Sequence, residues 1–177
     1  METLTLANGQ VVTIRTAQVA DAEAIIAYVN RVSGESPFLT FGEGEFDVSV
    51  AHEREIMASL GADRQWLLAL RDECIIGMAN VSRQSPRPRM RHRAVMGVSV
   101  SRDYWSMGIG RALMRWVITW CRAQGFEQLE LGVFAHNLRA RHLYESLGFV
   151  ATGSIPHAVK YPDGSYADEV MMSLRLG

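Results

Sequence analysis

The sequence predicts an α/β domain built on a mixed β-sheet with helices on its faces. Two observations carry this prediction: strand-like and helix-like segments alternate in the middle of the chain, and hairpin-like strand pairs lie on both sides of them. The 177 residues, of which 48% are hydrophobic and 21% charged, are enough for one substantial core. We therefore expect a single domain over residues 1–177.

The N-terminal third is expected to be a β-α unit followed by a loop. Val11–Thr16 has the content of a strand, and apolar residues recur at three-and-four spacing over residues 20–32, which predicts an amphipathic helix. Glycine, proline and several phenylalanines interrupt the pattern over residues 33–48. We expect a loop with an aromatic underside there, and loops of this kind often line pockets.

A hairpin and a basic loop follow. A short helix is expected at residues 50–60, and strands at 65–70 and 74–81 flank an acidic turn. Residues 83–93 hold five arginines and no acidic residue, so we expect an exposed loop. Its arginines either bind an acidic ligand or phosphate or are simply solvated.

The second half repeats the β-α order twice and ends in a hairpin around the strong turn Pro162-Asp163-Gly164. Glycines at 125 and 148 are candidate C-caps of the two helices. The expected elements are the strand 94–101, the helix Ile109–Ala123, the strand Gln128–Phe134, the helix 138–147 and the hairpin strands 149–155 and 166–176.

Charge and composition exclude several classes of protein. Eighteen Lys and Arg against nineteen Asp and Glu give a net charge of −1, without the basic excess expected of a nucleic-acid binder. No apolar run is long enough to span a membrane, and the N-terminus does not resemble a signal peptide. Cys74 and Cys121 lack the spacing of a metal or redox motif. We expect a cytoplasmic protein with no bound metal, nucleic acid or membrane.

The clearest candidate for a binding site is the start of the predicted helix at Ile109. Gly108 and Gly110 let the backbone approach a ligand closely, and the free N–H groups and dipole of a helix N-terminus favour a phosphate. Alone, the two glycines could equally form a tight turn. Leu113 stands where the dinucleotide fingerprint needs a small residue, and no lysine is present for a P-loop. Both of those phosphate motifs are therefore excluded.

A second polar pair follows the next predicted strand. Asn137 is placed to open a helix, and Tyr144 lies seven residues later on the same helix face. Taken alone, Asn137 is most simply an N-cap and Tyr144 an aromatic at the edge of the core.

Together, residues 98–113 and 137–149 resemble the GNAT superfamily of N-acetyltransferases, and the order of the remaining elements agrees. The resemblance implies a single GNAT domain with a central, mixed, mostly antiparallel twisted sheet flanked by helices. It also implies that acetyl-CoA is the cosubstrate and that a primary amine, more in keeping with a small molecule than with a protein, attacks the thioester directly in a ternary complex.

The resemblance assigns roles to particular residues. The phenol of Tyr144 would protonate the departing thiolate, and Asn137 would contact the pantetheine arm or the loop that holds it. The backbone of Val98, Ser99 and Val100 would pair with the pantetheine arm. The pyrophosphate would be cradled by Ser106, Met107, Gly108, Ile109, Gly110 and Arg111.

Two departures from the family pattern concern the phosphate loop and the general base. Trp105 stands where relatives carry Arg or Gln, which removes a side-chain contact but leaves the backbone cradle. Val95 and Met96 stand where many relatives have an acidic base. The base is therefore unassigned, Ser99 being too weak unaided. The remaining candidates are His92, Glu43, Glu45 and water.

The acceptor is expected between residues 33–46 and 157–166. Glu43, Glu45 and Asp47, together with nearby phenylalanines, would suit a small cationic amine. Two other functions stay open: acetylation of a protein or peptide, and a non-catalytic acyl-CoA sensor. A homodimer formed through the C-terminal strands is also possible.

Overall fold

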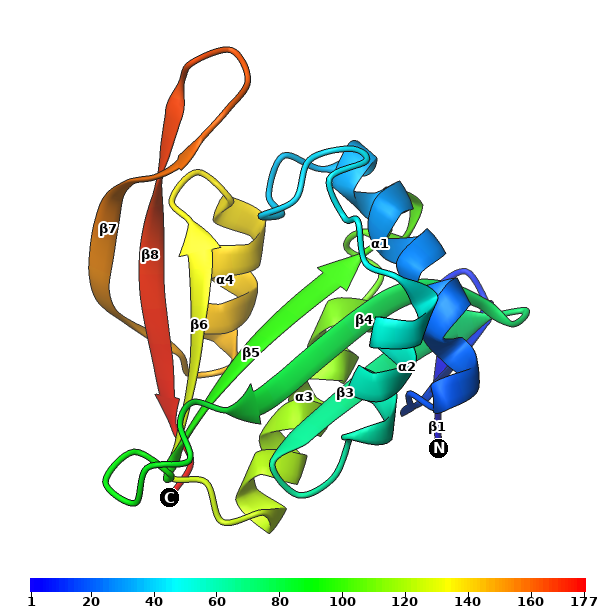
Figure 1. Ribbon diagram of the computed structural model, residues 1–177, viewed down its shortest axis with the longest axis horizontal. Coiled ribbons are helices and arrows are strands. Elements are labelled where there is room, and N and C mark those ends of the chain that lie inside the picture. The colour runs from blue at the N-terminus through cyan, green and yellow to red at the C-terminus, as the bar shows by residue number, and fades with distance from the viewer. The chain divides into compact units, whose positions relative to one another are not determined.

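The computed structural model describes all 177 residues as an eight-stranded mixed sheet with four α-helices and two short 3-10 helices. The strand order is β1-β2-β3-β4-β5-β6-β8-β7. The β5–β6 pair is parallel, whereas β1–β2, β2–β3, β3–β4, β6–β8 and β7–β8 are antiparallel. The predicted fold class, a mixed and mostly antiparallel sheet with helices, is confirmed (Figure 1).

The helices and strands occur in the predicted order, and most of their limits lie close to the predicted ones. The strands are β1 (Glu2–Thr5), β2 (Val11–Thr16), β3 (Arg64–Arg71), β4 (Cys74–Arg83), β5 (Arg93–Val100), β6 (Gln128–Phe134), β7 (Val150–Lys160) and β8 (Tyr166–Arg175). The helices are α1 (Ala22–Glu35), α2 (Val50–Ala58), α3 (Ile109–Ala123) and α4 (Leu138–Ser146), with 3-10 turns η1 (Val19–Asp21) and η2 (Arg102–Tyr104).

The chain divides into two compact units. One comprises residues 1–82 and 98–117, and the other comprises residues 83–97 and 118–177. Strand β5 and helix α3 contribute residues to both. No helix is both long and apolar enough to cross a membrane.

In the first unit, α1 and α2 bury their apolar faces in one cluster with β3 and β4. Ile25 and Tyr28 on α1 and Leu68 on β3 are each at most 1% exposed within it. The apolar three-and-four spacing that predicted α1 therefore corresponds to the face that packs in the core.

Helix α3 packs against β4 at Gly77. A Cβ built on Gly77 would lie 3.1 Å from Ile109 Cγ2 and 3.3 Å from Leu113 Cδ1, so the missing side chain permits close approach of the first two turns of α3. Ile109 and Leu113 are fully buried. This contact fixes the position of the N-terminus of α3, where the anion site was predicted.

Replacing Gly77 with alanine tests this contact. The added methyl must push Ile109 and Leu113 outward, and we expect overpacking to lower the free energy of unfolding by about 1 kcal/mol. Urea unfolding measures the effect. Gly61→Ala is the matched control, because a Cβ there meets nothing within 4 Å. Equal stability of the two variants would contradict this account of the packing.

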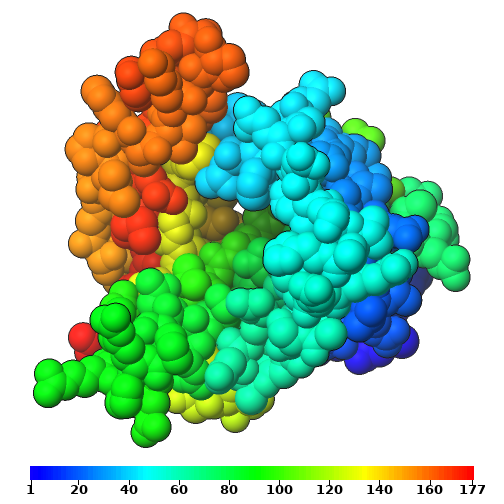
Figure 2. Space-filling model, viewed as in Figure 1, coloured from blue at the N-terminus to red at the C-terminus, as the bar shows by residue number.

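In the second unit, β6 lies between β5 and β8. The β6–β8 register runs without a shift from Gln128 opposite Arg175 to Phe134 opposite Glu169. The β7–β8 hairpin has two irregularities, and its tip extends past the carboxyl end of β6, as the orange and red segments of Figures 1 and 2 show. Its turn closes with bonds from Tyr161 N to Ser165 O and from Gly164 N to Tyr161 O.

Three elements differ from the predicted ones. Strand β1 was not predicted, because its four residues are largely exposed and leave no clear alternation. Helix α1 continues to Glu35 through Gly34. Strand β7 extends to Lys160, beyond the predicted end at 155, because the pairing with β8 resumes at Val159 after a bulge. Half of the segment 157–166 is therefore hairpin strand, and residues 161–165 form the turn at its tip.

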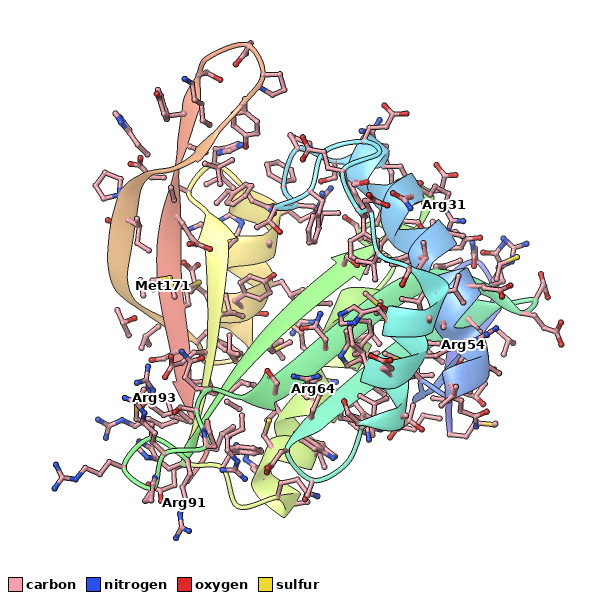
Figure 3. All side chains as sticks on the ribbon, viewed as in Figure 1. Arg31, Arg54, Arg64, Arg91, Arg93 and Met171 are labelled. Atoms are coloured by element: carbon pink, nitrogen blue, oxygen red, sulfur yellow. The ribbon has the colours of Figure 1, made fainter.

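The basic loop between β4 and β5 is anchored at both ends by arginines. Arg83 donates to the Arg91 carbonyl and lies over the Phe126 ring at 4.6 Å, while Arg93 binds Glu130. Arg87, Arg89 and Arg91 are exposed, and Figure 3 shows Arg91 directed away from the strands. Two of the five arginines thus serve the fold.

Candidate active site

A side chain of α1 fixes the carboxyl end of β5. The Tyr28 hydroxyl, on a side chain 1% exposed, lies 3.0 Å from Ser99 Oγ. Burial raises the pKa of Tyr28, so this phenol stays protonated and can donate to Ser99. Ser99, predicted in the strand that binds the pantetheine arm, is therefore tied to the core.

The turn from β5 to α3 is fixed by side chains on both sides. The Glu35 carboxylate accepts the Arg102 N–H at 2.7 Å, which satisfies the start of η2, and Arg71 donates to the Tyr104 hydroxyl at 2.8 Å. Trp105 donates its indole N–H to the Val100 carbonyl at 2.7 Å. The tryptophan, noted in the sequence as a departure from the resemblance, thus closes the turn that leads to the predicted phosphate loop.

Replacing Trp105 with phenylalanine is expected to weaken acetyl-CoA binding about 5-fold, because the ring is kept while one hydrogen bond worth about 1 kcal/mol is lost from this turn. Equilibrium binding of acetyl-CoA measures the effect. Trp120→Phe is the control, since Trp120 contacts Phe126 farther along the chain. Unchanged affinity in Trp105→Phe would show that the turn does not depend on the indole.

The predicted anion cradle is the N-terminus of α3. Ser106 and Gly108 have positive φ, 62° and 89°, and Gly108 O accepts the first helical bond from Ala112 N at 3.0 Å. The backbone N–H groups of the first helical residues point out of the helix end, where the helix dipole is positive. Gly108 is exposed, and a Cβ there would meet nothing within 4 Å. Space for a ligand therefore borders a set of backbone donors.

In the second unit, Asn137 opens α4 as its N-cap. Its Oδ1 accepts from Ala140 N at 3.2 Å, and its own N–H bonds to the Phe134 carbonyl at 2.8 Å. The predicted capping role is confirmed. The side-chain Nδ2 makes no hydrogen bond within the protein, so it can still donate to a ligand.

Tyr144 lies on α4, is 7% exposed, and packs near Phe149 with ring centroids 6.1 Å apart. Burial raises the pKa of its phenol to about 12. The hydroxyl makes no hydrogen bond within the protein. Tyr144 therefore carries an unshared proton that it keeps at neutral pH.

The parallel pairing between β5 and β6 is short. It runs only from Arg93 opposite Gln128 to Val95 opposite Glu130. Arg93 binds Glu130 with two bonds, at 2.5 and 2.7 Å, and this pair lowers the pKa of Glu130. The pairing that joins these strands is thus concentrated at their amino ends.

The residues that the sequence analysis named as candidate bases lie in the following surroundings. Glu45 accepts the N–H of Gly42 at 2.7 Å within its own loop, and the Glu43 carboxyl lies near Gly34. His92 precedes Val98 by six residues of extended chain, roughly 20 Å. Met96 is 5% exposed.

The structure brings the predicted residues together in two groups. The turn η2 joins Val98–Val100 to residues 106–111, and α4 carries both Asn137 and Tyr144. Sequence reasoning missed the roles of Trp105 and of Glu169, whose carboxylate on β8 lies over Gly132. Gly132 in β6 was the only sequence sign of the Glu169 contact, and what this glycine accommodates depends on the strand register.

The strand order and the helix N-terminus that directly follows β5 and η2 agree with the resemblance found in the sequence. The acetyltransferase (GNAT) family model matches residues 32–149, and the chain belongs to that family. By its description, this is a family of acetyltransferases.

Known proteins agree with this assignment. The chain is 34% identical over 86 residues to the L-amino acid N-acyltransferase MnaT of Escherichia coli, a match that spans 49% of each chain. It thus spans about half the length of this curated relative. A GNAT-family acetyltransferase structure from Streptococcus pneumoniae has a TM-score of 0.87 and 29% identity over 93% of this chain and 99% of that one. The structure of yncA from Salmonella typhimurium with acetyl-CoA shares the fold, with a TM-score of 0.81 and 24% identity over 94% of each chain.

Proposed function

We propose that this protein transfers the acetyl group of acetyl-CoA to the primary amine of a small molecule. The observation that carries the proposal is the backbone cradle at the N-terminus of α3, directly after the end of β5. Amino acids are the first acceptors to test, because the Escherichia coli relative is named an L-amino acid N-acyltransferase.

Residues 106–111 supply backbone donors for the pyrophosphate of acetyl-CoA. Ser106 and Gly108 have positive φ, the kind of backbone found in anion-binding turns, and the buried Ile109 side chain anchors the helix end. The backbone of Val98, Ser99 and Val100 pairs with the pantetheine arm in the manner of an added strand. The free Nδ2 of Asn137 donates to the arm or to the loop that holds it.

Tyr144 acts as the general acid. A thioester offers a carbonyl carbon for direct attack by a neutral amine and a thiolate as the leaving group. Because the pKa of Tyr144 is about 12, the phenol is protonated at neutral pH, and a thiolate whose conjugate acid has a pKa of about 8.5 takes that proton when it leaves.

Partners and location follow the same proposal. Cys74 and Cys121 are both free, as is common in the reducing cytoplasm.

The sheet ends at β7, a largely exposed strand, so pairing of two copies through it would form a homodimer that light scattering can detect. A single folding domain over residues 1–177 predicts one cooperative unfolding transition.

Thiol release from acetyl-CoA tests the activity, scanned over amino acids, polyamines and short peptides. We expect turnover with a small amine. Turnover with peptides alone would instead indicate a peptide acetyltransferase. The apolar Val95 and Met96 favour a non-catalytic sensor as the second candidate. A rise in melting temperature with acetyl-CoA, without thiol release from any acceptor, would support the sensor and overturn the enzyme.

A further inference from the structure

The carboxylate of Glu169 occupies space that a side chain at position 132 would fill. Phe134 pairs with Glu169 and Gly132 with Met171, so Glu169 and Gly132 are diagonal neighbours on one face of β6 and β8. A Cβ built on Gly132 would lie 2.7 Å from Glu169 Cδ and 3.3 Å from Cγ, with Oε1 closer still. Figure 3 labels Met171 on β8, two residues beyond Glu169. A strand with no side chain at 132 thus receives a carboxylate from its neighbour.

This carboxylate has no partner in the protein. Glu169 is partly buried, yet its side chain makes no hydrogen bond or ion pair. Glu130, on the same face of β6, is by contrast bound twice by Arg93 and once by Gln128 Nε2 at 2.7 Å. A partly desolvated carboxylate without donors is unfavourable unless a ligand supplies them.

Glu169 and Tyr144 lie on opposite faces of the strand pair. Gly148, just after α4, approaches Leu174 Cδ1, and Leu174 pairs with Leu129, so α4 covers the face that carries these leucines. Gly132 belongs to the other face, because successive side chains alternate along a strand, and it is exposed. An acid on one face and a base on the other suit a reaction in which the amine and the thiolate lie on opposite sides of the carbonyl carbon.

We propose that Glu169 is the proton acceptor for the amine that this enzyme acetylates, an inference that rests on the proposed function. The ammonium group of the acceptor donates to the carboxylate and loses one proton to it. The neutral nitrogen then bonds to the thioester carbon, and the C–S bond breaks. Tyr144 gives its proton to the sulfur and is reprotonated by water, while the new amide nitrogen loses its extra proton to water. The proton on Glu169 passes to water, so one acetyl-CoA and one ammonium yield one amide, one thiol and one proton.

Other carboxylates fit this role less well. Glu53 on α2 is 1% exposed with Oε1 unpartnered, but burial raises its pKa and so favours the protonated form, which cannot accept a proton. Glu45 is occupied by the Gly42 N–H. Glu169 combines an unpartnered carboxylate, a place beside the exposed Gly132 and the same two strands that adjoin α4.

Substitution of Glu169 by glutamine is the first test. We expect kcat for the amine to fall about 100-fold, with acetyl-CoA affinity and unfolding midpoint unchanged. Formate is expected to restore part of the activity of Glu169→Ala, which a merely structural role would not allow. Glu127→Gln, an exposed carboxylate before β6, is the matched control and should turn over normally.

Gly132→Ala tests the geometry independently. Its methyl group must displace the Glu169 carboxyl, so kcat should fall without loss of the residue itself. The double variant with Glu169→Gln should be no slower than Glu169→Gln alone, because both changes remove the same group.

The outcomes separate the two proposals. If wild-type enzyme is active and Tyr144→Phe is slow while Glu169→Gln stays within 2-fold of wild type, the role of Glu169 is overturned and the proposed function stands. Loss of acetyl-CoA binding in Glu169→Gln would likewise overturn it in favour of a structural role. Wild-type protein that acetylates no amine would overturn both.

Discussion

Replacing Tyr144 with phenylalanine is expected to lower kcat by at least ~100-fold while acetyl-CoA affinity stays within about 2-fold. The hydroxyl makes no hydrogen bond in the free protein, so removing it costs the fold no interaction. What is lost is the proton that stabilises the departing thiolate. The raised pKa of about 12 means that the wild-type phenol is protonated across the neutral range. Steady-state thiol release and equilibrium binding of acetyl-CoA give the two measurements.

Tyr28→Phe is the matched control for this variant. Tyr28 is also a buried tyrosine, but its hydroxyl bonds to Ser99 and is assigned no proton transfer. We expect it to lose about 1 kcal/mol of unfolding free energy and only a few-fold in kcat. The contrast separates loss of a hydroxyl from loss of an acid. Equal kcat in Tyr144→Phe and wild type would assign protonation of the thiolate to water.

The order of the elements could be predicted because local signals were strong. Apolar spacing marked α1 and α3, the Pro-Asp-Gly turn marked the last hairpin, and Asn137 marked the start of α4 as its cap. These features depend on neighbours within one or two turns of chain. The same locality explains why a cradle at Gly108 could be proposed from the sequence: strand, turn and helix N-terminus are consecutive.

The rest depends on pairing that the sequence does not encode locally. Glu169 is 37 positions from Gly132, and only an unshifted β6–β8 register makes them neighbours. Strand β7 reaches Lys160 because its pairing with β8 resumes at Val159 after a bulge, and this pairing depends on the residues of β8 that lie opposite. The sequence shows that Trp105 stands where relatives carry Arg or Gln. It does not show that the indole binds the Val100 carbonyl.

Replacing Arg93 with methionine is expected to lower the free energy of unfolding at pH 7 by about 3 kcal/mol, because it leaves Glu130 charged and largely buried. Arg93 donates two bonds to that carboxylate across the short parallel pairing of β5 and β6. Gln128 Nε2 alone would remain as its donor. Urea unfolding measures the loss, and Arg91→Met, in the same loop but exposed, should be close to neutral.

The pH dependence of this loss identifies its cause. The Arg93 hydrogen bonds lower the pKa of Glu130 below its unfolded value near ~4.3, so the contribution of the pair is fully present above that value. It is lost as pH falls through the lower, folded pKa. The difference between wild type and Arg93→Met should therefore shrink as the pH falls below about 4.3 and through the lower, folded pKa of Glu130. A difference that stays constant over that range would mean that Arg93 stabilises β5 through packing of its stem, with no contribution from the charge on Glu130.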